Sequence, residues 1–182
     1  MHSSKRRFDL NNSTFHKGSI FVSGFLLAFF LLTVPPAAFA TFQKGQAAPS
    51  LKVTTTSGQT VSLSNYKGHV LVLDFFASWC EPCKRAIPHL IELNRKYGKH
   101  GLQILGLSLD EDRKDLNEFV MPLKLNYPVA QADEDLQSGY GLRSIPTLVL
   151  IDKKGIVVEK YMGLTDEMRK TLDATIKRLL VE

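Results

Sequence analysis

The order of strand-like and helix-like segments predicts an α/β fold, with a mixed central sheet covered by helices on both faces. Two short strand segments come first, and strand and helix segments then alternate through the middle of the chain. Such alternation requires crossover connections, which make the central strands parallel. A hairpin signal at Asp152–Gly155 and a final amphipathic helix follow, so we expect an antiparallel strand at one edge of the sheet.

The predicted strands are short apolar or β-branched runs bounded by turn residues. His69–Phe76 is a nearly continuous apolar run, and Gln103–Leu109 is a second run of this kind, as expected of buried central strands. The first two strands flank the Ser57–Gly58 turn and form an N-terminal β-hairpin extension. The other predicted strands are Leu51–Val53, Val61–Leu63, Tyr127–Val129, Thr147–Ile151 and Ile156–Tyr161.

Four helices are predicted between and after these strands. The first follows the two cysteines of the chain and ends at Gly98, and shorter helices are expected at Asp112–Val120 and Leu136–Tyr140. The last helix has an apolar residue every four positions, with acidic residues early and basic residues late, as the helix dipole favours. Its predicted core stripe consists of Leu164, Met168, Leu172, Ile176 and Leu180.

Residues 1–40 are predicted to be a signal peptide or an N-terminal membrane anchor, and residues 41–182 the folded domain. Basic residues precede an apolar stretch, and Ala38–Phe39–Ala40 fits the small-x-small rule for cleavage after Ala40. The apolar segment Gly18–Val34 has 17 residues. As a helix it would span about 25 Å, short of the roughly 30 Å hydrocarbon core, which favours cleavage. Either outcome places the domain outside the cytoplasm, in the periplasm or tethered to the inner membrane.

Composition and charge indicate one globular domain without a nucleic-acid partner. The chain has 182 residues, of which 44% are hydrophobic and 23% are charged, as is typical of a folded domain. The net charge is +5, but the first forty residues carry +3 of it. The remaining sequence has no basic stripe with interleaved aromatic residues, the pattern that nucleic-acid binding would require.

The two cysteines of the chain, Cys80 and Cys83, stand three positions apart at the start of the first predicted helix. A disulfide that closes so small a loop adds little stability, so the pair indicates redox chemistry, with an inert structural disulfide as the alternative. The unpaired N–H groups and the dipole at a helix start stabilise a thiolate at Cys80, whereas Cys83 lies one turn inward.

Other uses of a cysteine pair fit the sequence less well. Haem attachment requires a histidine after the second cysteine, and Lys84 stands there. A structural zinc site requires two further ligands. The histidines of the predicted domain, His69, His89 and His100, show no helical pairing with one another. We therefore expect no bound metal and no cofactor.

The segment Asp74–Lys84, with the sequence DFFASWCEPCK, resembles the active site of the thioredoxin superfamily together with the strand that precedes it. Further motifs narrow the resemblance to the ResA/TlpA-like branch, and the similarity runs from about Ala47 to Leu180. These motifs are Tyr66–Lys67–Gly68, Pro128, Tyr140–Gly141 and Ile145–Pro146–Thr147. The resemblance implies a thioredoxin-like fold and thiol–disulfide exchange activity.

The resemblance also implies roles for the two cysteines and for one acid. Cys80 corresponds to the attacking nucleophile and Cys83 to the resolving thiol. Asp74 corresponds to a buried acid that exchanges a proton with the resolving cysteine. From the residues alone, a surface acid at a strand end is the alternative for Asp74, although an apolar run such as this one disfavours it.

Three further residues are implied to contact the substrate. Trp79 corresponds to a residue that covers the site, with an ordinary core residue as the equal alternative from the residues alone. Pro146 corresponds to a cis-proline beside the cysteines, where the backbone of Ile145 would pair with an extended substrate peptide.

The resemblance implies an extracytoplasmic thiol–disulfide oxidoreductase, and more specifically a reductase of client protein disulfides in cytochrome c maturation or a related envelope redox role. A reductase in an oxidising compartment needs a source of electrons, for which a membrane thiol-transfer protein is the expected partner. Ala86 departs from the pattern of reductases dedicated to cytochrome c maturation, which often carry a glutamate at this position.

Two alternative functions share this fold. A Sco-like copper-handling module uses a CxxxC spacing and a distant C-terminal histidine, whereas this chain has CxxC and no histidine after His100. A peroxiredoxin-type peroxidase shares the Ala48–Pro49 opening and the Tyr66–Gly68 stretch. Its cysteine lies in a Pro-x-x-x-Thr-x-x-Cys setting, however, and Leu73 and Ala77 occupy the positions of that proline and threonine.

Overall fold

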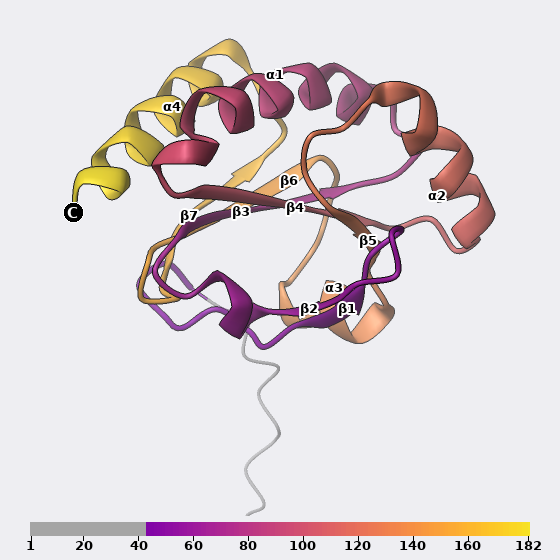
Figure 1. The fold of residues 1–182 in the computed structure, drawn as a ribbon, viewed down its shortest axis with the longest axis horizontal. Helices are drawn as coiled ribbons and strands as arrows, with labels where there is room; N and C mark the ends of the chain where they lie inside the picture. Colours follow the sequence, from indigo (N-terminus) through magenta and orange to yellow (C-terminus); the bar gives the residue numbers. More distant parts are fainter. Residues whose placement is uncertain (1–42) are drawn as a thin grey trace, which may run out of the picture. The chain divides into compact units, whose positions relative to one another are not determined.

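The structure, a computed structural model, describes residues 43–182, and their elements follow the predicted order (Figure 1). The strands are β1 (Lys52–Thr54), β2 (Thr60–Ser62), β3 (Val70–Phe76), β4 (Leu102–Ser108), β5 (Val129–Gln131), β6 (Thr147–Ile151) and β7 (Val157–Met162). Five of them form the central sheet in the order β5-β4-β3-β6-β7, while β1 and β2 pair as a separate antiparallel hairpin. β4 runs parallel to both β3 and β5, whereas β6 is antiparallel to β3 and to β7.

The helices are α1 (Glu81–Tyr97), α2 (Arg113–Val120), α3 (Glu134–Gly139) and α4 (Asp166–Val181), with short 3₁₀ turns at Leu63–Tyr66, Gly98–His100 and Met121–Leu123. The helices α1, α2 and α4 pack on one face of the sheet, and the β1–β2 hairpin and α3 pack on the other (Figure 1). The mixed sheet with helices on both faces and the N-terminal hairpin are therefore confirmed. None of the helices within residues 43–182 is long and apolar enough to cross a membrane. The predicted signal peptide or anchor lies outside the described residues.

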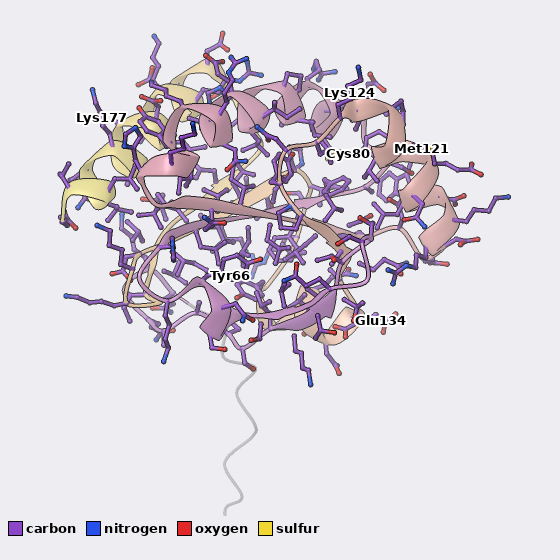
Figure 2. The ribbon with its side chains drawn as sticks, in the orientation of Figure 1. Tyr66, Cys80, Met121, Lys124, Glu134 and Lys177 are labelled. Atoms are coloured by element: carbon purple, nitrogen blue, oxygen red, sulfur yellow. A yellow bond between two sulfur atoms is a disulfide. The ribbon has the colours of Figure 1, made fainter. Side chains whose placement is uncertain are left out.

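Strand β3 lies at the centre of the sheet, and all seven of its residues are buried. Successive side chains of a strand point to opposite faces. Phe75 packs in the apolar cluster on the hairpin side, and Phe76 packs in the cluster on the α1 side. Asp74, two residues before Phe76, therefore faces the α1 side. Figure 2 shows the two sides through labelled residues, with Cys80 on the α1 side and Tyr66 on the hairpin side.

Strand β5 begins two residues later than the predicted strand Tyr127–Val129. Pro128 has no N–H group to donate to a neighbouring strand, although its carbonyl accepts a hydrogen bond of 2.9 Å from the N–H of Gly106. Regular pairing with β4 starts at Val129, opposite Gly106. Tyr127 is thus outside the strand, and its side chain is buried in the cluster on the α1 side.

The predicted core stripe of the last helix is only partly correct. Leu164 precedes α4, which begins at Asp166 with Thr165 as its N-cap. Leu180 is only partly buried, and Leu179 takes its place in the core. A spacing of four residues exceeds the 3.6 residues of a helical turn, so a strict four-residue repeat drifts off the buried face over several turns.

Candidate active site

Cys80 and Cys83 form a disulfide at the start of α1, with an S–S distance of 2.00 Å. Cys80 is the N-cap residue, and its sulfur accepts a hydrogen bond of 3.2 Å from the N–H of Cys83. Pro82 lies in the first turn, where its missing N–H costs no helical hydrogen bond. Cys80 is 6% exposed and Cys83 is 1% exposed. Cys80 is therefore the less deeply buried residue of the two, and it lies next to N–H groups that can stabilise a thiolate.

The loop between β3 and Cys80 is held by Asp110, which follows the end of β4 and is buried. Its carboxylate accepts hydrogen bonds from the Ser78 N–H at 3.0 Å and from the Ser78 hydroxyl at 2.8 Å. It also accepts one from the Ser108 hydroxyl at 2.5 Å. Because Phe76 and Ser108 are opposite each other in the β3–β4 register, this acid ties together the ends of two neighbouring parallel strands.

The sequence analysis did not identify Asp110, Ser78 or Ser108. The signal that points to them is their position, because each is a short polar residue at or just after the end of a predicted parallel strand. The carboxyl ends of parallel strands meet at one edge of a sheet, which is where the cysteine motif also lies.

Asp74 is fully buried in the middle of β3, so the alternative of a surface acid is wrong: only 1% of the residue is exposed. Its register neighbours are Gly106 on β4 and Leu148 on β6, and neither offers a polar side chain. Within residues 43–182 neither carboxylate oxygen has a hydrogen-bond partner. Burial disfavours the charged form and raises the pKa of Asp74 from 3.8 to about 7. Asp74 can therefore gain or lose a proton near neutral pH.

The peptide bond between Ile145 and Pro146 is cis, as the resemblance implies. The Pro146 carbonyl accepts a hydrogen bond of 2.7 Å from the N–H of Gly163, which ties the start of β6 to the residue after β7. Ile145 is partly buried against the apolar cluster that contains Cys80 and Cys83. Thr147, the residue after Pro146, is opposite Phe75 near the end of β3. The cis peptide and the cysteine motif therefore adjoin the same edge of the sheet, although they are more than sixty residues apart in the sequence.

Trp79 is 69% exposed, so the alternative of an ordinary core residue is wrong. It stands between Ser78, which is anchored by Asp110, and Cys80. Met162 at the end of β7 is another exposed large apolar residue, and it is opposite Thr147, the residue after Pro146. Exposed apolar side chains therefore occur beside both sequence motifs of the site, which is typical of a surface that binds another chain.

No group of three or more histidine, cysteine, aspartate or glutamate side chains that could hold a metal ion occurs within residues 43–182. The chemistry that the described groups can perform is thiol–disulfide exchange at Cys80 and Cys83, with Asp74 able to exchange a proton on the same side of the sheet.

Known proteins resemble this chain over most of the described residues. The sequence pattern of the AhpC/TSA family matches residues 44–160. Thiol-disulfide oxidoreductase ResA from Bacillus thuringiensis (strain Al Hakam) is 34% identical over 138 residues, which cover 75% of this chain and 79% of that protein. Thioredoxin-like protein YneN from Bacillus subtilis is 29% identical and covers 72% of this chain and 79% of its own length.

Among solved structures, the putative thiol:disulfide interchange protein DsbE from Chlorobium tepidum superposes with a TM-score of 0.73 at 31% identity. The match covers 76% of this chain and 99% of the other. A putative protein disulfide isomerase from Bacteroides thetaiotaomicron has a TM-score of 0.71 at 27% identity, and the match covers 77% of this chain and 91% of that one. The family match runs from before β1 into β7, so the similarity extends well beyond the cysteine motif.

Proposed function

Since the chain belongs to the AhpC/TSA family and is a thiol–disulfide oxidoreductase related to ResA, we propose that it acts outside the cytoplasm as a reductase of disulfides in client proteins. The observation that carries the proposal is the Cys80–Cys83 disulfide at the start of α1, on the side of the sheet that the buried acid Asp74 faces. This arrangement supplies a nucleophile at the helix end, a resolving thiol and a proton acceptor.

The reaction begins from the reduced dithiol. The Cys80 thiolate attacks one sulfur of the client disulfide, which forms a mixed disulfide and releases the first client thiolate. Cys83 then loses its proton to the Asp74 carboxylate, and its sulfur attacks the Cys80 sulfur. The Cys80–Cys83 disulfide forms and the second client thiolate leaves, so two electrons pass from the enzyme to the client. A dithiol partner, for which we propose a membrane thiol-transfer protein, returns these electrons.

Asp74 suits the second step because its pKa of about 7 leaves both of its protonation states populated at neutral pH. A general base is most effective when its pKa lies near the working pH. Cys83 is buried, where the charged thiolate is disfavoured, so it benefits from an acceptor for its proton. We propose that Trp79, Ile145 and Pro146 contact the client chain.

The structure favours this reaction over the two alternatives. Leu73 of β3 and Ala77, the residue after this strand, stand where a peroxidase would carry the proline and threonine of its peroxide site, and both are buried core residues. A Sco-like copper site would require a histidine after His100, and the sequence contains none. Ala86, on the buried face of α1, takes the position of the glutamate expected in dedicated cytochrome c maturation reductases. We therefore propose a client in cytochrome c maturation or in a related envelope process.

The reduction potential of the Cys80–Cys83 pair tests the direction of the reaction. Equilibration in redox buffers of known potential, followed by alkylation and mass spectrometry, should give a value below roughly −200 mV, in the range of thioredoxin-like reductases. A value close to about −120 mV, as for the oxidant DsbA, would contradict the reductase proposal.

A fusion tests the location. Residues 1–40 joined to a phosphatase that is active only outside the cytoplasm should give phosphatase activity, and the fusion without these residues should not. Equal activity of the two fusions would contradict an extracytoplasmic location.

A further inference from the structure

Tyr127 is a second buried polar residue beside Asp74. It comes from the turn before β5, which lies on the far side of β4 from β3. Gly106 of β4 is opposite Asp74 in the β3–β4 pair and opposite Val129 in the β4–β5 pair. Tyr127 and Asp74 therefore approach the same glycine from its two sides.

Gly106 leaves space for the ring of Tyr127 on the face of the sheet that Asp74 occupies. A Cβ atom at Gly106 would lie 3.5 Å from Cε2 of Tyr127, and only 3.0 Å from Cγ2 of Val129 and 3.2 Å from Cε1 of Phe76. Phe76 and Tyr127 both belong to the cluster on the α1 side. Neighbouring strands lie about 4.8 Å apart, so a phenol over Gly106 is one strand spacing from Asp74.

The polar ends of both residues lack partners. Within the part of the chain that the structure describes, neither the Tyr127 hydroxyl nor either carboxylate oxygen of Asp74 has a hydrogen-bond partner, although all three atoms are buried. Burial first, and the charge of Asp74 second, raise the pKa of Tyr127 far above its usual range. The hydroxyl thus keeps its proton at any physiological pH and can act as a donor.

Tyr161 of β7 is a second tyrosine of the cluster on the α1 side with a buried hydroxyl. It is opposite Leu148 of β6, two strands away from β3, and the charge of Asp74 affects the pKa of Tyr127 but not that of Tyr161. Tyr127 is therefore the nearer donor to Asp74.

The register neighbours of Asp74, Gly106 and Leu148, have no polar side chain, and α4 contributes the apolar Leu172 and Ile176 to this cluster. From α1, the titratable groups in the cluster are Cys83, which takes part in the reaction, and Tyr97, whose hydroxyl donates a hydrogen bond to Asp173. A buried carboxylate without a donor is strongly disfavoured, and a hydrogen bond to its charged form favours ionisation.

We propose that, when Asp74 ionises, the Tyr127 hydroxyl, which has no partner within the described residues of the disulfide form, turns to donate a hydrogen bond to the carboxylate and thereby keeps this acid available as the proton acceptor for Cys83. The inference deepens the proposed function and rests on it. Tyr127 acts through Asp74 and is a positioning residue. When Asp74 has taken the proton, the neutral acid no longer requires the donor.

The variant Tyr127→Phe tests the proposal because it removes one oxygen atom and keeps the ring over Gly106. The titration of Asp74, followed by carboxyl ¹³C NMR of the oxidised protein, should move up by about one pH unit when the donor is lost. Burial without a donor accounts for the pKa of about 7, so the donor of the wild type should place the titration of Asp74 about one pH unit lower. Turnover of a model disulfide by Tyr127→Phe should then fall about fivefold at pH 6 and recover by pH 9. The control is Tyr161→Phe, the same deletion in β7 in the same cluster, which should leave the titration of Asp74 unchanged.

The outcomes separate this inference from the proposed function. An unchanged titration of Asp74 in Tyr127→Phe overturns the inference, and so does an equal shift in Tyr161→Phe. If Asp74→Asn still slows turnover in either case, the proton-acceptor role of Asp74 stands without Tyr127. If the titration moves in Tyr127→Phe alone but Asp74→Asn turns over at the normal rate, the pairing stands and the proposed role of Asp74 in the reaction is wrong.

Discussion

Two buried carboxylates near the cysteines have opposite surroundings. Asp74, in the middle of β3, is enclosed by apolar groups and has no hydrogen-bond partner within residues 43–182. Asp110, just beyond β4, accepts hydrogen bonds from the Ser78 N–H and from the hydroxyls of Ser78 and Ser108. Hydrogen bonds replace the water that Asp110 loses on burial, whereas Asp74 can relieve the cost of burial only by taking a proton. Asp110 therefore holds the geometry of the loop, whereas Asp74 can exchange protons.

The two acids also belong to different steps of the proposed reaction. Asp110 anchors the loop that leads into Cys80, the residue that meets the client. Asp74 faces the cluster that contains Cys83, the residue that resolves the mixed disulfide. Substitution of Asp74 should therefore raise the free energy of unfolding, whereas substitution of Asp110 should lower it. The first change should affect resolution of the mixed disulfide, and the second the step at Cys80.

The largest effects are expected at the cysteines themselves. Cys83→Ser should abolish turnover and accumulate mixed disulfides between Cys80 and client proteins, because the resolving thiol is absent. Cys80→Ser should also abolish turnover but should trap nothing. In the reduced protein, Cys80 should be alkylated before Cys83 at pH 7, because it lies at the helix end and is the more exposed of the two. Peptide mass spectrometry after brief iodoacetamide treatment measures this order, and earlier labelling of Cys83 would reverse the assigned roles.

Asp74→Asn should slow disulfide turnover about tenfold or more, the lower part of the range for a general base, and should leave alkylation of Cys80 largely intact. It should also stabilise the protein in a pH-dependent manner. Burial raises the pKa of Asp74 from 3.8 to about 7, so between these pH values the native state holds a proton that the unfolded chain has released. The free energy of unfolding of the wild type therefore falls as pH rises through this window and stays reduced above it.

The increase in the free energy of unfolding caused by Asp74→Asn should therefore grow as pH rises. It should be close to zero near pH 4 and on the order of 4 kcal/mol at pH 8, as a displacement of about three pH units implies. Urea denaturation of the oxidised proteins at both pH values measures it. An equal effect at pH 4 and pH 8 would show that ionisation of Asp74 is not the source.

Asp110→Asn should have the opposite sign and should destabilise the protein by about 2 kcal/mol. The amide has one acceptor oxygen and no charge, so it cannot satisfy the donors of Ser78 and Ser108 that now share the carboxylate. Urea denaturation at pH 7 measures the loss, with Glu111→Gln as the control at the next, exposed position. A loss as small as that of Glu111→Gln would mean that the hydrogen bonds of Asp110 do not tie the strand ends together.

The sequence predicted the features that local patterns encode. The apolar run of β3, the cysteine spacing and the motif around Pro146 each occupy a few consecutive residues. The Asp110 network was missed because Ser78 and Asp110 are 32 positions apart and meet only when β3 and β4 align in register. Tyr127 was assigned to a strand because its aromatic side chain has a high strand propensity. Its buried position depends on the missing side chain at Gly106, which no local pattern indicates.

The smallest expected effect is the energetic coupling between the two acids, and it is the most direct test of whether they are independent. Asp110 lies four residues beyond Gly106, the register neighbour of Asp74, which is about 13 Å along the sheet. They share no hydrogen-bond donor, and burial alone accounts for the raised pKa of Asp74. Changes at sites so far apart usually add within about 0.5 kcal/mol.

The double variant Asp74→Asn with Asp110→Asn should therefore show a change in unfolding free energy equal to the sum of the single changes, within about 0.5 kcal/mol at pH 8. A double-mutant cycle at pH 8 and at pH 4 identifies the cause of any larger value. Coupling through charge should disappear at pH 4, because Asp74 is then largely protonated, and should weaken in 1 M salt. Coupling of more than 1 kcal/mol that persists at pH 4 would mean that the anchored loop and the buried strand position move together, so the two acids could not be assigned to separate steps.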